Sequence, residues 1–511
     1  MIYFLIALLA IFGFRRLLFC MKFMQQNNYY NYRLVRFMFE KFQLVDKRVS
    51  IPFLFAAILS LFVQEQLILA IPAIAMCLQI YREKNPTKGG IKPLNITGRV
   101  KRIFGVAFAL WLGATTLSLF IPATLFYMTA IVVIAPLFLI AANTILVPYE
   151  WLDRKKYLDE AKAKLKKFNP IVIGVTGSFG KTSVKNILHH ILGSFSSSFA
   201  TKRSINTIMG IVRVIREEMN SQTKYFVAEM GTGQPGQIAQ LARFLRPTHG
   251  IITAVGSAHL ENFKTVDAIA REKFALSRYV GKNGGQTILA AANIDPEFIK
   301  KYAAQDDIVF SGKEVSNIKQ TIDGLSFTLT FDGKKHEVFA PIYGMHQAQN
   351  IAISFMMAAR VGANPESIIS ALKTLKQTEH RLEVKREGEL IVIDDAFNSN
   401  MSGFISALET GDAIKGKGRF ILITPGMVGL DAAHAEQHMA VGKVANKLCD
   451  VVIAVNPDRI KDFTKEISAK KLVLAPTLTE ARTWLASNAQ PGDVVLYEND
   501  LPDLYIEKIR I

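Results

Sequence analysis

The sequence predicts an α/β protein with two parallel-sheet domains, preceded by a helical transmembrane region. Three observations predict this class. Apolar runs fill much of residues 1–150, strand-like and helix-like segments alternate from residue 169 onward, and a glycine-rich loop follows the first of these strands. We expect the membrane region at 1–150, a basic juxtamembrane helix at 151–168, and the two α/β domains at 169–381 and 382–511.

Composition excludes several classes of protein. With 511 residues, 50% of them hydrophobic, and a mean hydropathy of +0.22, the chain is too long and too apolar for a single soluble domain. Residues 1–150 carry 15 Lys and Arg against 5 Asp and Glu, whereas 151–511 carry 46 against 38. The basic excess thus lies among apolar runs, which favours anionic lipid headgroups as partners and argues against nucleic acid. Three widely spaced cysteines argue against a zinc ribbon or a disulfide framework.

The apolar runs predict about five membrane spans. Residues 1–20 form one retained anchor, 51–82 a short hairpin or re-entrant pair, and 103–148, which contain no charged residue, two spans. The loops 21–50 and 83–102 each hold six Lys and Arg, which places both on the cytoplasmic side. Everything after residue 150 is then cytoplasmic. The lysine-rich run that follows is interpreted as a solvated helix touching lipid headgroups.

A phosphate-binding loop opens the α/β part. The β-branched run Ile171–Thr176 predicts a buried strand, and 184–192 has helical periodicity. Between them lie Gly177, Ser178, Gly180, Lys181, Thr182 and Ser183, which are the predicted ATP-binding residues. Backbone N–H groups at a helix start can cradle phosphates, a lysine supplies a mobile charge, and a threonine hydroxyl can ligate Mg²⁺. The spacing departs from a strict Walker A loop, because a valine occupies the position of its first glycine.

Segment TGSFGKTSVKNILHHIL, which begins at Thr176, resembles the ATP loop of the Mur ligase family. The SVK after GKT is similar to the members that add D-alanyl-D-alanine to a peptidoglycan precursor. The resemblance implies a central ATP-binding domain and a Rossmann-like C-terminal domain, with ATP and two Mg²⁺ ions bound. It implies a ligase reaction in which an amine attacks an acyl-phosphate. It also implies a muramoyl-peptide donor, an acceptor such as D-alanyl-D-alanine, and a bacterial inner membrane location with the catalytic domains in the cytoplasm.

Further motifs match the family in the same order. Glu229 ends an apolar run and resembles the family's Mg²⁺-binding glutamate, and a strand's carboxyl edge is where open α/β sheets place ligands. His259 matches a histidine that helps to hold a second Mg²⁺. Lys273 matches the lysine that Mur ligases carbamylate to make a metal-bridging carboxylate, although the glutamate that usually follows is Ala275 here.

Substrate and nucleotide contacts are expected at three more positions of the central domain. Asn206 resembles a substrate-contacting asparagine, although the usual following proline is Val212. Asn350 matches the residue that reads the adenine. His346, four residues earlier, matches a position near the nucleotide, but a histidine at a helix start is more often a cap partner.

Two motif-bearing segments lie where the central domain ends, at Arg381, and where the C-terminal domain begins. Arg381 resembles the arginine that reaches the phosphates after domain closure. Asp395 and Asn398 lie in DDAFNSN, which resembles a family signature that contacts nucleotide and acceptor. The usual KGS near the end is replaced by Tyr497-Glu-Asn-Asp500, which leaves the identity of the acceptor open. Later strands and helices alternate as in a Rossmann-like sheet.

The segment before residue 169 departs from the family. Its loops are too short for the family's nucleotide-gripping first domain, since a small domain needs at least about 50 residues. We therefore expect a lipid-linked donor, or one delivered by a partner. Three alternatives stay open: a poly-glutamate-type synthase, a membrane transporter or sensor powered by the phosphate loop, and an inactive scaffold.

Overall fold

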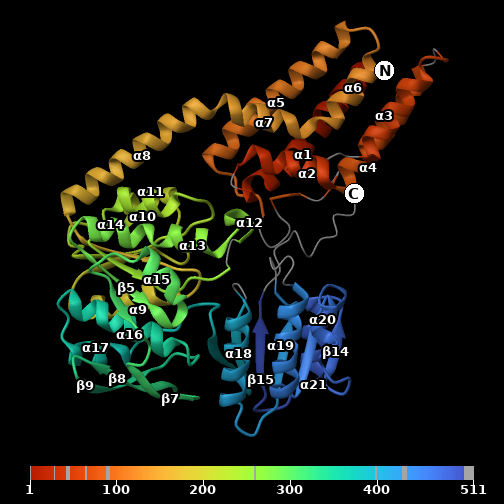
Figure 1. The fold of residues 1–511 in the computed structure, drawn as a ribbon. Coiled ribbons are helices and arrows are strands. Elements are labelled where there is room, and N and C mark those ends of the chain that lie inside the picture. Colours follow the sequence, from red (N-terminus) through yellow and green to blue (C-terminus); the bar gives the residue numbers. More distant parts are fainter. Residues whose placement is uncertain are drawn as a thin grey trace. The chain divides into compact units, whose positions relative to one another are not determined.

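The computed structural model describes residues 2–27, 29–41, 47–63, 66–83, 85–87, 93–257, 260–396, 400–427 and 434–499 (Figure 1). The chain separates into two compact units, Met1–Lys155 and Lys156–Asp500. Among the described residues, the first unit contains helices and no strand, and the second contains three β-sheets.

Eight helices are described up to residue 168: α1 (Ile2–Gln26), α2 (Asn31–Lys41), α3 (Lys47–Leu59), α4 (Ala70–Arg82), α5 (Gly98–Leu117), α6 (Thr124–Val133), α7 (Ala135–Ile145) and α8 (Val147–Phe168). The described residues of segment 21–50, which was expected as a loop between apolar runs, are largely helical, because the segment contains no glycine or proline to end a helix. The expected basic helix is α8, which begins four residues earlier than predicted.

Two helices in the described part of the chain are long and apolar enough to cross a membrane: α1, and α5 with the short turn that extends it to Phe120. Helices α6 and α7, bent by 67° at their junction, make a third candidate if they act as one span. Helices α3 and α4 have 13 residues each and pack against each other, as the expected short hairpin requires. Both are shorter than the roughly 20 residues of a straight span, so five spans stays a prediction.

Large apolar side chains cover the surface of the first unit. Its interior is also apolar, with Phe12, Phe53 and Trp111 fully buried. A water-soluble unit rarely exposes so many large apolar groups together. The exposed ones include Phe4, Ile11, Phe55, Ile58, Phe62, Leu67, Ile74, Leu78, Leu110, Leu117 and Phe120.

Ion pairs accommodate the charged residues of this unit. Arg16 of α1 contacts Glu83 at 3.0 Å, and both side chains are buried. Arg102 of α5 contacts Glu150 of α8 at 2.8 Å. Pairing lowers the cost of placing such groups beside apolar helices.

Replacing Gly13 by alanine is expected to destabilise the first unit by about 1–3 kcal/mol, as overpacking does in a filled core. A methyl group there would come within 2.1 Å of Trp111 Nε1. Gly113→Ala is the matched control, because a methyl group at this other helical glycine would meet nothing within 4 Å. Thermal unfolding of detergent-solubilised protein measures both. Equal effects of the two substitutions would contradict the prediction.

The second unit begins with a six-stranded parallel sheet, in the order β2-β3-β1-β4-β5-β6. One face packs against α9 (Lys181–Phe195) and α16 (Gln347–Arg360), and the other against α10 (Ile208–Glu218), α11 (Gln237–Leu245) and α14 (Ala275–Lys282). The strands are β1 (Ile171–Thr176), β2 (Ser198–Ala200), β3 (Tyr225–Glu229), β4 (His249–Ile252), β5 (Gln286–Ala290) and β6 (Ile308–Phe310); the remaining helices are α12 (Leu260–Phe263), α13 (Val266–Lys273), α15 (Pro296–Tyr302) and α17 (Pro365–Leu372).

A small antiparallel sheet lies between the two larger ones in the sequence. It consists of β7 (Val315–Thr321), β8 (Gly324–Phe331) and β9 (Lys334–Ala340). Leu325, Phe327 and Leu329 alternate toward the same core as α9 and α16, so this sheet packs beside that layer of helices.

The last sheet has the order β10-β11-β15-β12-β13-β14, and only β10 is antiparallel to its neighbour. Helices α18 (Met401–Ile414) and α19 (His434–Leu448) cover one face, and α21 (Leu478–Asn488) covers the other. This is the predicted Rossmann-like alternation. The strands are β10 (Glu383–Glu387), β11 (Leu390–Asp395), β12 (Phe420–Thr424), β13 (Val451–Val455), β14 (Leu472–Ala475) and β15 (Val494–Glu498); α20 (Lys461–Thr464) precedes β14.

Candidate active site

The predicted phosphate loop connects β1 to α9. Gly180 lies at the N-cap of α9 with φ +80°, a left-handed conformation that suits glycine. Gly177 packs so closely that a methyl group there would lie 2.0 Å from Thr253 Oγ1. Ser178 is tied to the segment after β4, since its Oγ accepts from the N–H of Gly256 at 2.9 Å. The loop thus presents a helix N-terminus at the carboxyl edge of the sheet, where an anion is stabilised.

Lys181 is the first residue of α9 and folds back over the loop. Its Nζ donates to the carbonyl oxygens of Gly177 at 2.7 Å and Ser178 at 3.3 Å. Burial lowers the pKa of Lys181; nearby Glu229 opposes this shift and Arg381 adds to it. The ammonium is therefore poised beside the phosphate loop, within the field of both a carboxylate and a guanidinium.

Glu229 lies at the carboxyl end of β3, directly beside Val175 of β1. Its Oε2 accepts from the hydroxyl of Thr182 at 2.9 Å, and its Oε1 accepts from Asn206 Nδ2 at 3.0 Å. A buried carboxylate and a threonine hydroxyl at a phosphate loop are oxygen ligands of the kind that Mg²⁺ prefers. These residues fit a magnesium ion bound together with a nucleotide phosphate.

Lys273 ends α13 and is only 2% exposed. Burial lowers its pKa to about 7, and the positive charge of Lys181 adds to the shift. The preceding residue, Glu272, points elsewhere and accepts from the N–H groups of Gly236 and Ile238, both at 2.7 Å. Lys273 therefore places an amine with a low affinity for protons near the phosphate loop.

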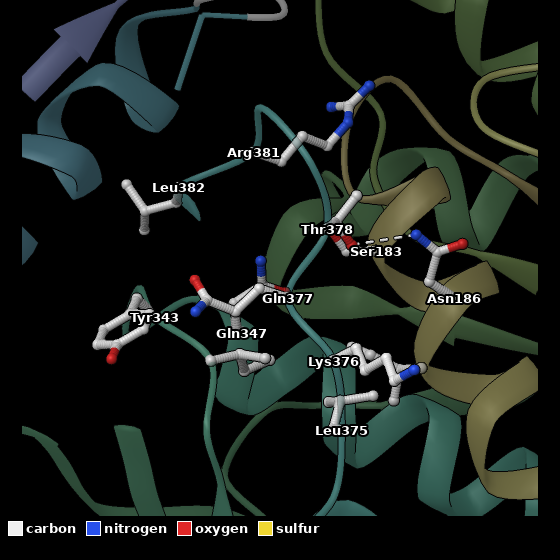
Figure 2. A pocket seen from close by; sticks show the side chains of 12 residues that line it. Ser183, Asn186, Tyr343, Gln347, Leu375, Lys376, Gln377, Thr378, Arg381 and Leu382 are labelled. Carbon is white, nitrogen blue, oxygen red and sulfur yellow. Dashed lines mark hydrogen bonds between the residues drawn. The ribbon is translucent and has the colours of Figure 1, made fainter. Parts of the chain in front are cut away.

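A pocket lies between α9, the start of α16 and residues 375–382 (Figure 2). Asn186 of α9 donates to Thr378 Oγ1 at 3.0 Å across it, and Arg381 lines it together with Ser183. Burial lowers the pKa of Arg381, while Glu229 and Asp395 oppose the shift. The pocket thus joins α9, next to the phosphate loop, to the segment that carries Arg381.

Asn350, in the first turn of α16, is buried beside the phosphate loop. Its Oδ1 would lie 3.2 Å from a methyl group at Gly180, and its Nδ2 donates to Gln347 Oε1 at 2.9 Å. His346 makes no cap hydrogen bond; its Nδ1 shares a hydrogen bond with Ser406 Oγ of α18 at 2.8 Å. The interpretation of His346 as a cap partner was therefore wrong, because the side chain turns toward a distant helix.

Asp395 ends β11 and accepts from the N–H of Leu382 at 3.1 Å. Burial raises its pKa, and Arg381 opposes the shift. The hydrogen bond connects the end of β11 to the segment that carries Arg381, so these two predicted residues do lie in one region.

Most of the predicted residues gather at the phosphate loop: Lys181, Thr182, Asn206, Glu229, Lys273, Asn350 and Arg381. His259 and Asn398 lie outside the described residues. The residues not predicted are Lys185, Asn186, Tyr343, Gln347 and Thr378. Lys185 and Asn186 lie in the motif that begins at Thr176, whereas Tyr343, Gln347 and Thr378 line the pocket through the meeting of distant segments.

Comparisons with known proteins agree with this arrangement. Residues 175–358 match the Mur ligase middle domain, and residues 380–497 match the Mur ligase glutamate ligase domain. A UDP-N-acetylmuramoyl-tripeptide–D-alanyl-D-alanine ligase from Bacillus subtilis is 28% identical over 59% of this chain and 63% of its own length. A Mycobacterium bovis protein of the same name is 30% identical over 47% of this chain and 48% of its own length. The chain thus spans less than two thirds of these relatives.

Solved structures share the fold. MurF ligase from Thermotoga maritima, in complex with ADP, superposes with a TM-score of 0.60 at 24% identity, covering 70% of this chain and 81% of that one. MurF from Acinetobacter baumannii superposes with a TM-score of 0.59 at 22% identity, covering 68% and 78%. Together the two matched domains occupy more than half of the sequence. The chain therefore contains the middle and C-terminal domains of the Mur ligase family.

Proposed function

We propose that this protein is an ATP-dependent ligase that joins a carboxylate to an amine through an acyl-phosphate. The observation that carries the proposal is the cluster of Lys181, Thr182, Glu229 and Lys273 at a phosphate loop. A transporter or sensor driven by ATP has no evident use for the buried Lys273, and an inactive scaffold has no evident use for the set as a whole.

In the proposed reaction a donor carboxylate oxygen attacks the γ-phosphorus of ATP, which gives an acyl-phosphate and ADP. The acceptor amine then attacks the acyl carbon, phosphate leaves with the C–O bonding electrons, and the nitrogen loses a proton. Lys181 would turn from its loop carbonyls to the phosphates, and Arg381 would add a second positive charge. Thr182 and Glu229 would hold Mg²⁺, which supplies charge neutralisation at the phosphate oxygens.

Lys273 is proposed to carry a carbamate. A neutral amine can add to CO₂ and release a proton, and the new carboxylate could hold a second Mg²⁺. The buried position favours this chemistry because the amine loses its proton near neutral pH. His259 is the proposed partner in that second site.

Turnover is expected to fall as the pH drops below about 7, because Lys273, with a pKa of about 7, becomes protonated and can no longer add to CO₂. Above that pH the amine is neutral and the carbamate forms. The measurement is the rate of phosphate release between pH 6 and 8.5, with and without added bicarbonate. Bicarbonate should restore part of the activity at pH 6.5; a rate that is independent of bicarbonate and pH would contradict the carbamate.

The substrates proposed are a muramoyl peptide and D-alanyl-D-alanine or a similar amine. They rest on the matched domains and on the names of the relatives. The apolar first unit supports a bacterial inner membrane location, with several spans and the catalytic domains in the cytoplasm, and a lipid-linked donor. Basic residues in 21–50 and 83–102 favour that orientation.

The test measures phosphate release by the detergent-solubilised protein with ATP and Mg²⁺. D-alanyl-D-alanine is offered with either a UDP-linked or a lipid-linked muramoyl tripeptide. Release that needs both donor and acceptor supports the ligase, and preference for the lipid-linked donor supports a role of the membrane unit in donor binding. Full activity on the UDP-linked donor alone would refute the lipid-linked proposal, and no release with any amine would refute the ligase.

Replacing Gly231 by alanine is expected to raise the KM for the donor about tenfold, which corresponds to about 1.4 kcal/mol. A methyl group there would come within 2.4 Å of Asn206 Cγ and push this side chain off Glu229. The matched control is Gly233→Ala in the same loop, where a methyl group meets nothing within 4 Å. Steady-state kinetics at saturating ATP measure the effect. An unchanged KM in Gly231→Ala would remove Asn206 from donor binding.

A further inference from the structure

Lys185 is a fully buried lysine for which the proposed chemistry has no role. It lies one helical turn after Lys181 on α9 and is 0% exposed. Its Nζ donates to the carbonyl oxygen of Thr201 at 2.7 Å and to that of Arg203, and it lies 3.8 Å from Glu229 Oε2. The ammonium thus lies between the loop that contains Thr201 and Arg203 and the carboxylate of Glu229, a residue of the proposed metal site.

This loop, residues 201–206, connects β2 to α10 and is fastened to Glu229 at both ends. At its start, Thr201 Oγ1 accepts from the N–H of Glu229 at 3.1 Å. At its end, Asn206 Nδ2 donates to Glu229 Oε1 at 3.0 Å, and the carbonyl oxygen of Asn206 accepts from the N–H of Gly231 at 2.9 Å. The position of Asn206 therefore depends on the course of the loop.

Between these two ends the backbone adopts a conformation that needs support. Arg203 has φ +46°, in the left-handed region that side chains other than glycine, asparagine and aspartate rarely adopt. Such a conformation persists where surrounding contacts hold it. Two contacts hold it here: the turn bond from the N–H of Ile205 to the carbonyl of Lys202 at 3.0 Å, and the bond from Lys185 to the carbonyl of Arg203 itself.

The positive charge of Lys185 makes its contacts with the loop hard to replace. A buried ammonium is stable only when its N–H groups and its charge are compensated; here two carbonyls accept hydrogen bonds and the Glu229 carboxylate lies 3.8 Å away. Removing it would leave the carbonyls of Thr201 and Arg203 without this donor and Glu229 without one of its positive neighbours. The loop would then relax toward water, and Asn206 would move with it.

We propose that Lys185 is a positioning residue that holds loop 201–206 against Glu229 and so places Asn206 for the carboxylate donor. The donor part of this inference rests on the proposed function; the anchoring of the loop does not. Two measurements test the anchoring of the loop and the placement of Asn206 for the donor separately.

The first measurement is limited proteolysis of the full-length, detergent-solubilised protein. Lys202 and Arg203 are exposed in the loop, so trypsin reports its opening. In Lys185→Met, cleavage at these two residues should accelerate at least about tenfold, as loss of a buried charged hydrogen bond predicts. Cleavage after exposed Lys282, in the same domain, should not change.

Lys185→Arg restores the charge and the donors, and should return the cleavage rate toward that of the wild type. Faster cleavage at every site would indicate general unfolding instead, and equal loop cleavage in Lys185→Met and wild type would overturn the anchor. Neither result depends on ligase activity. The proteolysis therefore tests the anchoring of the loop even if the proposed ligase activity is not found.

The second measurement is a double-mutant cycle on the donor KM. Lys185→Met and Asn206→Ala should each raise it about tenfold, with the KM for ATP changed less than about threefold. The double variant should match the single ones, because both changes remove the same contact. Ser354→Ala, a buried hydroxyl on α16 hydrogen-bonded to the carbonyl oxygen of Asn350, is the control and should not couple to Asn206. Additive effects of the Lys185 and Asn206 substitutions would overturn the positioning role.

Discussion

Replacing Lys273 by alanine is expected to reduce phosphate release at least about a thousandfold, the scale seen when one group that stabilises a transition state is lost. The substitution removes the amine that would carry the carbamate, and with it one ligand of the second metal site. Lys273 is buried at the end of α13 next to Glu272, whose hydrogen bonds to the start of α11 should survive. The measurement is the rate of phosphate release at saturating ATP and Mg²⁺.

Two comparisons make this result specific. Lys282→Ala removes an exposed lysine of the adjacent helix and should leave the rate unchanged. Millimolar formate or acetate should partly restore Lys273→Ala, because a small carboxylate can occupy the space left by the side chain. A variant that keeps full activity would show that Lys273 has only a packing role.

The second large effect is expected for Lys181→Met. Its ammonium now rests on the carbonyls of Gly177 and Ser178, and in turnover it would neutralise the transferred phosphate. Loss of this charge should lower kcat by about a thousandfold. Nucleotide binding should weaken less, because the backbone N–H groups at the start of α9 remain.

The measurements are single-turnover phosphate release and equilibrium binding of ADP. A loss confined to ADP binding, with kcat preserved, would contradict a role of Lys181 in the transition state. Lys185→Met provides an internal contrast. It removes a lysine one turn away, and its main expected effect is on the KM for the donor.

Local sequence patterns predicted much of the site. The run Ile171–Thr176 followed by glycines and a helical segment gave the strand, the loop and α9 where the structure has them. Glu229 was predicted at a strand end, and since β1 and β3 are parallel neighbours, their carboxyl ends meet at one edge. These predictions succeeded because they depend on residues that are close in sequence and on the regular geometry of parallel sheets.

Other features depend on contacts between distant segments. The side chain of His346 was expected to cap its own helix, but it bonds to Ser406, 60 residues away. Segment 21–50 was expected as a loop between apolar runs, whereas most of its described residues are helical. The pocket beside Ser183 forms only where α9, α16 and residues 375–382 meet.

The sequence by itself determined the class of this protein, its phosphate loop and the identity of its principal charged residues. Hydrophobic periodicity and short motifs are local, so they can be read without knowing the packing. The tertiary structure alone decided which carbonyls surround Lys185 and how Asn206 reaches Glu229. It also decided that burial lowers the pKa of Lys273 to about 7. Such properties come from groups that only folding brings together, because desolvation and hydrogen bonding depend on the complete environment of a side chain.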